Sequence, residues 1–314
     1  MLLITSILYA ALPLGCAGAA IATQAGALNQ VHQFPDGTSV ENIAVRENGN
    51  LLVTLLYEAQ ILEINPTQAS TGNSTANLVH YFNGSTRVNG ISELTPDVFA
   101  VSANHDTIWT MDLSAGGDAQ LSKIVTIANA SFLNGVTTLD AAAGTVLVAD
   151  SSVGLIWFVN TLTGEYSIAL QDTTMAAATI PSSGMSLGVN GARYRDGFVY
   201  YTNTGKQLFC RVQVDPATGS AVGPYETIAQ GFAGDDLALS TTDDAAYVAS
   251  GSSNVVQKIF FDGSQELVVG GANSTDVAGA TSVVYGRTGQ DSDVLYVTTS
   301  GGGVGGGKVM AVRV

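Results

Sequence analysis

Basic residues, histidine and cysteine are all scarce in this chain, and their scarcity excludes several classes of function. The 314 residues include 11 Lys and Arg against 26 Asp and Glu, a formal net charge of −15. Nucleic acids and anionic membranes are bound through clustered cations, so neither is an expected partner. The three histidines, His32, His80 and His105, lack the spacing of a catalytic triad or of a zinc site.

Long apolar runs are missing beyond the N-terminus, so no membrane span is expected in the mature chain. Residues 1–25 are uncharged, and their apolar core is short and interrupted by Pro13. Small residues follow that core, which predicts a signal peptide over 1–19 and a secreted or secretory-pathway protein. Cleavage would remove Cys16 and leave Cys210 without an intramolecular disulfide partner. Four glycosylation sequons agree with this leader: Asn73, Asn83, Asn129 and Asn273.

Proline is rare and glycine abundant, 7 against 36 residues, which indicates many tight turns. A unit consisting of a polar anchor residue, an apolar strand and further strands recurs along the chain. Its spacing of about 45 residues is the size of a four-stranded propeller blade. The six units begin at Glu41, Asn89, Asn134, Asn190, Asp235 and Ala278. The sequence therefore predicts an all-β, six-bladed β-propeller as a single domain over 28–314.

Two segments outside the repeat have predicted places in this ring. The strand-like stretch 28–34 precedes the first unit, and we expect it to pair with the last blade and close the ring. The longest insertion, 175–188, separates the third and fourth units. We expect it to form a loop over one face, where it could serve as a lid.

Anchor residues of successive blades meet around the central axis of a propeller. Glu41, Asn134, Asn190 and Asp235 would therefore converge there, with two carboxylates and two amide oxygens. Such a donor set suits Ca²⁺ or Mg²⁺ better than Zn²⁺, and no organic cofactor is expected. The alternative is structural, because Asn-Gly and Asp-Asp are ordinary turn residues that can cap an inner strand.

The order "ENIAV", "LNGV", "VNGA" and "GDDLAL" resembles the SMP-30/gluconolactonase/LRE-like superfamily of six-bladed propellers. The resemblance covers residues 28 to 314. It implies that Glu41, Asn134, Asn190 and Asp235 hold a divalent metal, with Asp236 as a neighbouring alternative to Asp235. It also implies catalytic roles for Asp235, Asn134 and Asn190.

One position departs from the sugar-lactonase pattern, which has an arginine two residues before the third-blade asparagine. Here that residue is Phe132, which favours an apolar or aromatic ligand over a sugar acid. The phrases around Glu41 and Asn190 look most like the fungal branch, which includes hetero-Diels–Alderases of tropolone-sesquiterpenoid biosynthesis. Besides Phe132, the candidate substrate-binding residues are Asn89, Arg193 and His32.

Two enzymatic functions follow from this resemblance. The first is a secondary-metabolism cyclase that joins a quinone-methide-type heterodiene to an apolar terpenoid alkene. The second is a metal-dependent lactonase, in which the cation polarises the lactone and Asp235 or Glu41 assists a water. A non-enzymatic propeller that binds a protein partner ranks third.

Overall fold

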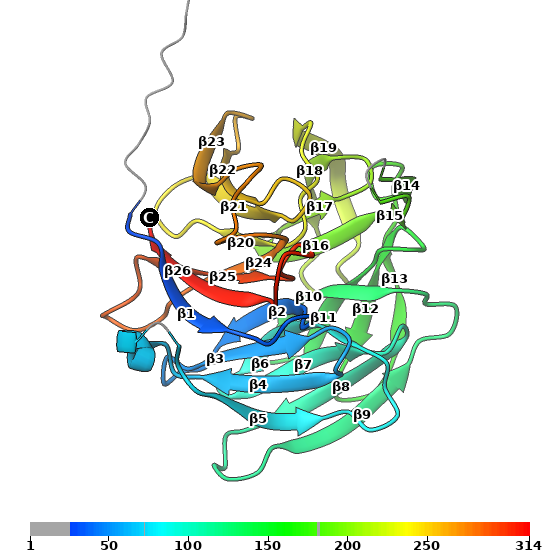
Figure 1. The fold of residues 1–314 in the computed structure, drawn as a ribbon. Helices are drawn as coiled ribbons and strands as arrows, with labels where there is room; N and C mark the ends of the chain where they lie inside the picture. The colour runs from blue at the N-terminus through cyan, green and yellow to red at the C-terminus, as the bar shows by residue number, and fades with distance from the viewer. Residues whose placement is uncertain (1–25, 72, 181–182) are drawn as a thin grey trace, which may run out of the picture.

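Nearly all regular structure is β-strand, and the strands form six four-stranded antiparallel sheets around a central axis (Figure 1). The computed structural model describes residues 26–71, 73–180 and 183–314, so the predicted signal peptide and Cys16 lie outside the described residues. No helix in these ranges is both long and apolar enough to cross a membrane. The predicted six-bladed propeller is confirmed.

Each blade begins with the strand nearest the axis, and the inner strands of neighbouring blades contact one another. Blade one consists of β2 (Val40–Val45), β3 (Leu51–Leu55), β4 (Gln60–Ile64) and β5 (Ala76–Tyr81). Blade two consists of β6 (Val88–Thr95), β7 (Val98–Ala103), β8 (Thr107–Asp112) and β9 (Gln120–Thr126). Blade three consists of β10 (Leu133–Asp140), β11 (Thr145–Asp150), β12 (Leu155–Asn160) and β13 (Tyr166–Leu170).

The second half of the ring repeats this arrangement. Blade four consists of β16 (Val189–Arg195), β17 (Phe198–Asn203), β18 (Leu208–Val214) and β19 (Ala221–Gln230). Blade five consists of β20 (Leu237–Leu239), β21 (Ala245–Ser250), β22 (Val255–Phe260) and β23 (Gln265–Gly270). Blade six consists of β24 (Ala280–Tyr285), β25 (Val294–Thr299), β26 (Lys308–Arg313) and β1 (Asn29–Gln33). The one helical element among the described residues is the 3₁₀ turn η1 (Pro66–Thr71).

Chain closure joins the two ends of the described chain in blade six. Strand β1 pairs antiparallel with β26, with Asn29 opposite Ala311 and Gln33 opposite Lys308 (Figure 1). This pairing confirms the predicted closing strand. It also satisfies the backbone groups of β26 that would otherwise form an exposed sheet edge.

The hydrophobic core lies between the blades rather than at the axis. Each of the six buried apolar clusters joins the facing surfaces of two adjacent blades. Every residue of the second strands β3, β11, β21 and β25 is buried, as expected for strands covered on both faces. The main apolar clusters therefore lie between the blades, and polar side chains are free to occupy the part of the axis where the inner strands begin.

The long insertion between blades three and four forms a short hairpin of β14 (Ala178–Thr179) and β15 (Ser186–Leu187). It is fixed to the ring because the Gly188 N–H donates to the Ser151 carbonyl at 2.6 Å, and the Asn203 side chain donates to the Thr174 carbonyl at 2.7 Å. The chain enters β16 directly after Gly188. The hairpin therefore lies at the end of the ring where the inner strands begin.

Candidate functional site

A β-bulge occurs in the inner strands at the predicted anchors. In β2 the pairing register shifts around Glu41, and similar shifts occur in β6, β10, β16 and β24. In blade five the Asp235 N–H donates to the Ala249 carbonyl at 2.8 Å, and the Ala249 N–H donates to the Asp236 carbonyl at 2.9 Å. Two residues of the inner strand thus lie opposite one residue of the second strand, which changes the direction of the side chains in the bulge. Consecutive residues of one strand can therefore both reach the axis.

The sixth anchor differs from its prediction. The bulge of β24 falls at Thr281, three residues after Ala278. Ala278 is buried before the strand begins, so its assignment as the sixth anchor is wrong. The run of small residues around it contains no charged or amide side chain that marks where the inner strand turns toward the axis.

The recurring Asn-Gly pair has a steric cause. A Cβ atom on Gly90 would lie 2.2 Å from the Asn134 carbonyl oxygen, and one on Gly135 would lie 2.7 Å from the Asn190 carbonyl oxygen. A Cβ atom on Gly191 would lie 2.3 Å from the Asp236 Oδ1 and 2.6 Å from the Asp236 Cα. Glycine is therefore required at these positions because neighbouring inner strands approach each other through their backbones.

Hydroxyl side chains on the second strands hold these bulges in place. The Thr54 hydroxyl accepts a hydrogen bond from the Asn42 N–H at 2.9 Å and donates to the Asn89 carbonyl at 2.7 Å. Ser102 and Thr202 make the corresponding links from blades two and four. Each hydroxyl satisfies the bulge of its own blade and ties it to the anchor of the next.

Three of the four predicted metal ligands interact directly or through their charges. The charge of Glu41 raises the pKa of Asp235, whereas the side chain of Asn190 lowers it. Asn134 is buried on the inner strand between those of Asn89 and Asn190. The anchors therefore form one polar ring at the end of the channel where the inner strands begin.

Burial and mutual repulsion shift the acidity of this ring. Burial, followed by the charge of Asp236, raises the pKa of Glu41 to about 7, while the charge of Arg87 opposes that rise. Burial also raises the pKa of Asp235 well above its usual range, followed by the charges of Glu41 and Asp236. A buried ring with these properties stabilises a cation or a proton.

The asparagine amides have their nitrogen atoms engaged by the protein. The Asn89 Nδ2 donates to a backbone carbonyl of β10, and its Oδ1, although buried, accepts no hydrogen bond from the described residues. Asn134 and Asn190 donate to the hydroxyls of Ser151 and Thr204, at 3.2 and 2.8 Å. The amide oxygens therefore remain available as ligands or acceptors.

This donor set fits a hard divalent cation. It combines the carboxylates of Glu41 and Asp235 with amide oxygens, among them the unpartnered Asn89 Oδ1. Within the described ranges, no three His, Cys, Asp or Glu side chains alone form a metal-binding group. A cation here would depend on the asparagines, which favours Ca²⁺ or Mg²⁺ over Zn²⁺.

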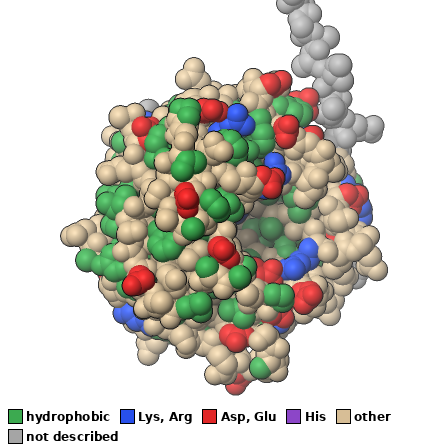
Figure 2. Space-filling model, turned by 180° about the vertical axis from the view of Figure 1, so that it is seen from behind, with side chains coloured by type: hydrophobic (Ala, Val, Ile, Leu, Met, Phe, Trp, Pro, Cys, Tyr) green, Lys and Arg blue, Asp and Glu red, His purple; other side chains and the backbone are tan. Residues whose placement is uncertain are grey.

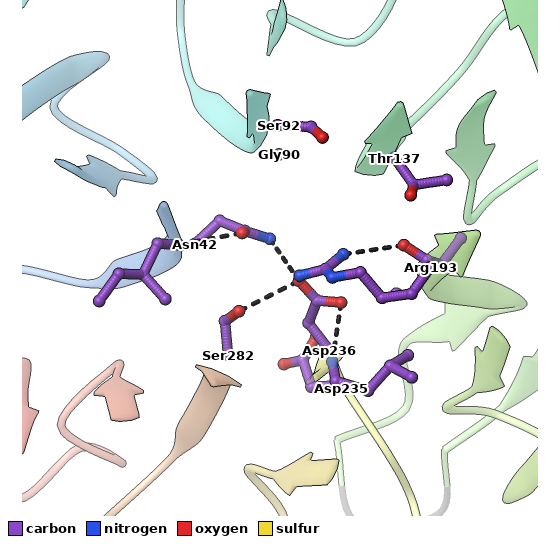
Figure 3. Close-up of polar contacts among 12 residues, drawn as sticks. Asn42, Gly90, Ser92, Thr137, Arg193, Asp235, Asp236 and Ser282 are labelled. Carbon is purple, nitrogen blue, oxygen red and sulfur yellow. Dashed lines mark hydrogen bonds and ion pairs between the residues drawn. The ribbon is translucent and has the colours of Figure 1, made fainter. Parts of the chain in front are cut away.

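A second polar cluster lies one residue further along the inner strands. Figure 3 shows Asn42, Arg193 and Ser282 pointing toward Asp236 at the centre of the ring. The Asp236 Oδ2 accepts hydrogen bonds from Asn42 at 2.8 Å, Arg193 at 2.7 Å and Ser282 at 3.1 Å. Arg193, predicted to bind substrate, is thus held in an ion pair with a buried carboxylate. Sequence reasoning assigned no role to Asn42 and treated Asp236 only as an alternative to Asp235.

Phe132 lies at the rim of the anchor ring. It is half-buried, and its N–H donates to the Asp150 Oδ1 at 3.0 Å. The Arg87 guanidinium lies 4.8 Å from the Phe132 ring centroid, and the His105 ring lies 6.3 Å from it on centroids. The predicted apolar substitution is therefore accompanied by a cation from blade two that the sequence analysis did not identify.

The other end of the channel has a different character. A cavity of about 250 Å³ lies further along the inner strands, beyond the anchors, with apolar side chains such as Ile91 and Val284 beside Glu93, Arg193 and Arg287. Figure 2 shows a hollow on one face of the molecule, with hydrophobic side chains inside and charged side chains around it. The Arg287 Nη1 pairs with the Glu93 Oε2 at 2.6 Å.

His32 does not approach the axis. It lies on β1, the outermost strand of blade six, where its Nδ1 is 2.5 Å from the Ser74 carbonyl oxygen. This position does not support His32 as a substrate-binding residue at the axis, because β1 adds to the outer edge of its sheet.

All four sequon asparagines, Asn73, Asn83, Asn129 and Asn273, are exposed. Exposure makes these side chains accessible to a modifying enzyme in the secretory pathway. Glycosylation at these positions remains a prediction.

Comparison with known proteins gives relatives at moderate identity. No family model matches the chain. A hetero-Diels-Alderase of Phoma sp. is 28% identical over 308 residues, which cover 85% of both chains. The hetero-Diels-Alderase asR5 of Sarocladium schorii is 27% identical, with 85% of this chain and 77% of its own length covered.

Solved structures share the fold at lower identity. A luciferin-regenerating enzyme superposes with a TM-score of 0.68 at 16% identity, covering 92% of this chain and 95% of its own. A gluconolactonase of Xanthomonas campestris gives a TM-score of 0.65 at 12% identity, covering 92% and 89%. The chain therefore shares its six-bladed propeller fold with a luciferin-regenerating enzyme and a gluconolactonase, and its sequence resembles proteins named as hetero-Diels-Alderases.

Proposed function

We propose that this protein is a secondary-metabolism enzyme of the hetero-Diels–Alder type, which binds an aromatic or apolar small molecule at the anchor end of the axial channel. The observation that carries this proposal is the similarity to two proteins of that name, each covering 85% of the chain. Phe132 supports it, because this half-buried aromatic residue lies two residues before the buried anchor Asn134.

The proposed reaction needs no protein nucleophile. A quinone-methide-type heterodiene and an alkene form one C–C and one C–O bond in a single step, and no atom is gained or lost. Holding the reactants in register can lower the barrier by roughly 7–11 kcal/mol at best. A donor directed at the heterodiene oxygen would stabilise the charge that builds there in the transition state.

The anchor ring can also serve this reaction by binding a cation. Glu41, Asn89, Asn134, Asn190 and Asp235 would hold a divalent ion, which when bound would polarise a nearby oxygen. The protein side chains would fix the orientation of the ligand, and Phe132 would cover its apolar part. Catalytic roles for Asn134, Asn190 and Asp235 belong to this proposal.

The test is stereochemical. Purified protein is mixed with an ortho-quinone methide generated in solution and an apolar terpenoid alkene, and the product is analysed on a chiral column. An enantiomeric excess that disappears on heat denaturation supports the proposal. Product with the same rate and composition as the reaction without protein would refute it.

A metal-dependent lactonase is the second candidate, favoured by the acidic pair of the anchor ring. Asp235 or Glu41 could accept a proton from an attacking water, since burial raises the pKa of both. Hydrolysis of a lactone panel that is abolished by a chelator and restored by Ca²⁺ or Mg²⁺ would support this function. A panel that stays intact with either ion argues against it.

We also propose that the chain enters the secretory pathway and is glycosylated at its exposed sequons. Expression of the full chain in a eukaryotic host should give secreted protein whose mass falls on deglycosylation. Retention in the cytoplasm at unmodified mass would refute both points.

A further inference from the structure

Arg87 differs from every other arginine of the chain in its partners. The other arginines each form an ion pair with a carboxylate: Arg46, Arg193, Arg195, Arg211, Arg287 and Arg313. Arg87 forms no ion pair with any described residue, and its Nε is buried without a hydrogen-bond partner. Among the described arginines, Arg87 is alone in this respect. No described residue accepts a hydrogen bond from its Nε.

The surroundings of Arg87 direct it toward the anchor ring. It lies two residues before Asn89, and its charge acts on the buried Glu41. Its guanidinium stacks over the half-buried Phe132 ring, at 4.8 Å from the centroid. Stacking restricts the side chain, so that less conformational freedom is lost when its donors bind an oxygen atom.

We infer that Arg87 binds the oxygen atom of the ligand at the anchor end of the channel, while Phe132 packs against the ligand's conjugated ring. This inference rests on the proposed function and identifies the ligand as a planar, conjugated molecule with a carbonyl oxygen. In the cycloaddition Arg87 keeps all its protons. It donates hydrogen bonds to the oxygen that becomes part of the new C–O bond.

The assignment makes Arg87 a specificity-determining residue. A guanidinium site discriminates against a ligand that lacks the oxygen, because such a ligand displaces water from the guanidinium without supplying an acceptor. A charge-assisted hydrogen bond also strengthens as negative charge grows on the acceptor. Loss of Arg87 should therefore reduce kcat as well as the affinity for the oxygen-bearing reactant.

The test uses two probes that differ in one carbonyl group, acetophenone and ethylbenzene, titrated into the full protein and followed by NMR. Arg87→Met should weaken acetophenone binding about tenfold, equivalent to about 1.4 kcal/mol, and leave ethylbenzene binding unchanged. Arg87→Lys should recover part of the loss, because it restores the charge without the planar fork.

Arg211→Met is the matched control. Arg211 also stacks on an aromatic ring, Phe198 at 5.2 Å, but it lies on β18 and pairs with Glu226. This variant should bind both probes as the wild type does. Acetophenone binding that is absent in the wild type, or that is the same in Arg87→Met, overturns the assignment. Arg87-dependent binding without enantioselective cycloaddition would instead leave the assignment intact and refute the proposed reaction.

Discussion

The two halves of the inner ring share one backbone geometry and differ in side chains. Blades two to four carry Asn-Gly at the bulge, and we call them the Asn-Gly half. Blades five, six and one carry Asp-Asp, Thr-Ser and Glu-Asn, and we call them the acidic half. In the Asn-Gly half neighbouring backbones touch, whereas in the acidic half side chains fill the same level. Close backbone packing therefore restricts the residues of the Asn-Gly half, whereas charge interactions between side chains restrict those of the acidic half.

The difference explains where the channel is sensitive to change. In the acidic half, Asp236 gathers three donors, and Arg193 reaches across from blade four to neutralise it. The other two acids, Glu41 and Asp235, form no ion pair with any described residue; the charge of Glu41 disfavours ionisation of Asp235, and the charge of Arg87 only partly offsets the rise in the pKa of Glu41. The layer that contains Asp236 and Arg193 is thus electrically balanced. The adjacent layer, which contains Glu41 and Asp235, is not.

The largest effect should follow removal of the balanced charge. Asp236→Ala leaves Arg193 near the axis without its carboxylate, which should cost about 3–5 kcal/mol in the free energy of unfolding. Urea denaturation measures this loss. Asp196→Ala is the control, because that carboxylate pairs with Arg195 at 3.8 Å but its side chain is 91% exposed. A loss below about 1 kcal/mol for Asp236→Ala would show that the cluster does not stabilise the ring.

The unbalanced layer should appear in the pH dependence of stability. Since folding raises the pKa of Glu41 from 4.5 to about 7, the native state binds more protons than the unfolded state in this range. The free energy of unfolding should therefore fall as pH rises from about 4.5 to about 7, by up to about 3 kcal/mol. Chemical denaturation at several pH values measures the slope.

Two variants and one ion isolate the cause of this slope. Glu41→Gln should make the profile less steep, because one of the two buried carboxyl groups with a raised pKa is gone. At pH 8, Ca²⁺ should raise the melting temperature of the wild type, and Asp235→Asn should weaken that response by removing one negative ligand. A Ca²⁺ response that is unchanged in both variants would mean that the anchor residues only cap the inner strands and do not bind the cation.

The stability of the Asn-Gly half should be sensitive to added side-chain volume rather than to changes of charge. Gly90→Ala places a methyl group 2.2 Å from the Asn134 carbonyl oxygen, so the backbone must shift, at a cost of about 2 kcal/mol. Gly289→Ala is the matched control, because nothing lies within 4 Å of its Cβ position. Equal denaturation midpoints for the two variants would contradict the close approach of the inner strands.

The blade count and closing strand could be predicted because each depends on local pattern. Apolar second strands and polar anchors recur at a regular spacing, and β1 needed only an unpaired edge to join. The side-chain contacts at the axis could not be predicted from such a local pattern. Asp236 meets Asn42 and Ser282 only because the ring closes, and no spacing in the sequence encodes that meeting.

The role of Arg87 could not be predicted from the sequence either. Nothing in its sequence neighbourhood separates it from the ion-paired arginines, and only the fold reveals that no described carboxylate pairs with it. The prediction that His32 binds substrate lacks support for a topological reason: the sequence does not show to which edge of the sheet a closing strand adds, and β1 adds to the outer edge. One signal was available, however: Glu41-Asn42 and Asp235-Asp236 replace Asn-Gly, so a side chain stands where glycine is otherwise required.

The smallest effect should come from trimming one donor of the balanced cluster. Ser282→Ala removes a 3.1 Å hydrogen bond to Asp236, which keeps its bonds from Asn42 and Arg193. Because the carboxylate stays paired, the loss should be about 1 kcal/mol. Ser264→Ala, which removes an exposed hydroxyl bonded to Asp262 at 2.7 Å, should leave the urea midpoint nearly unchanged. If Ser282→Ala costs as much as Asp236→Ala, the three donors act as one unit, and neutralisation by Arg193 alone does not balance this layer.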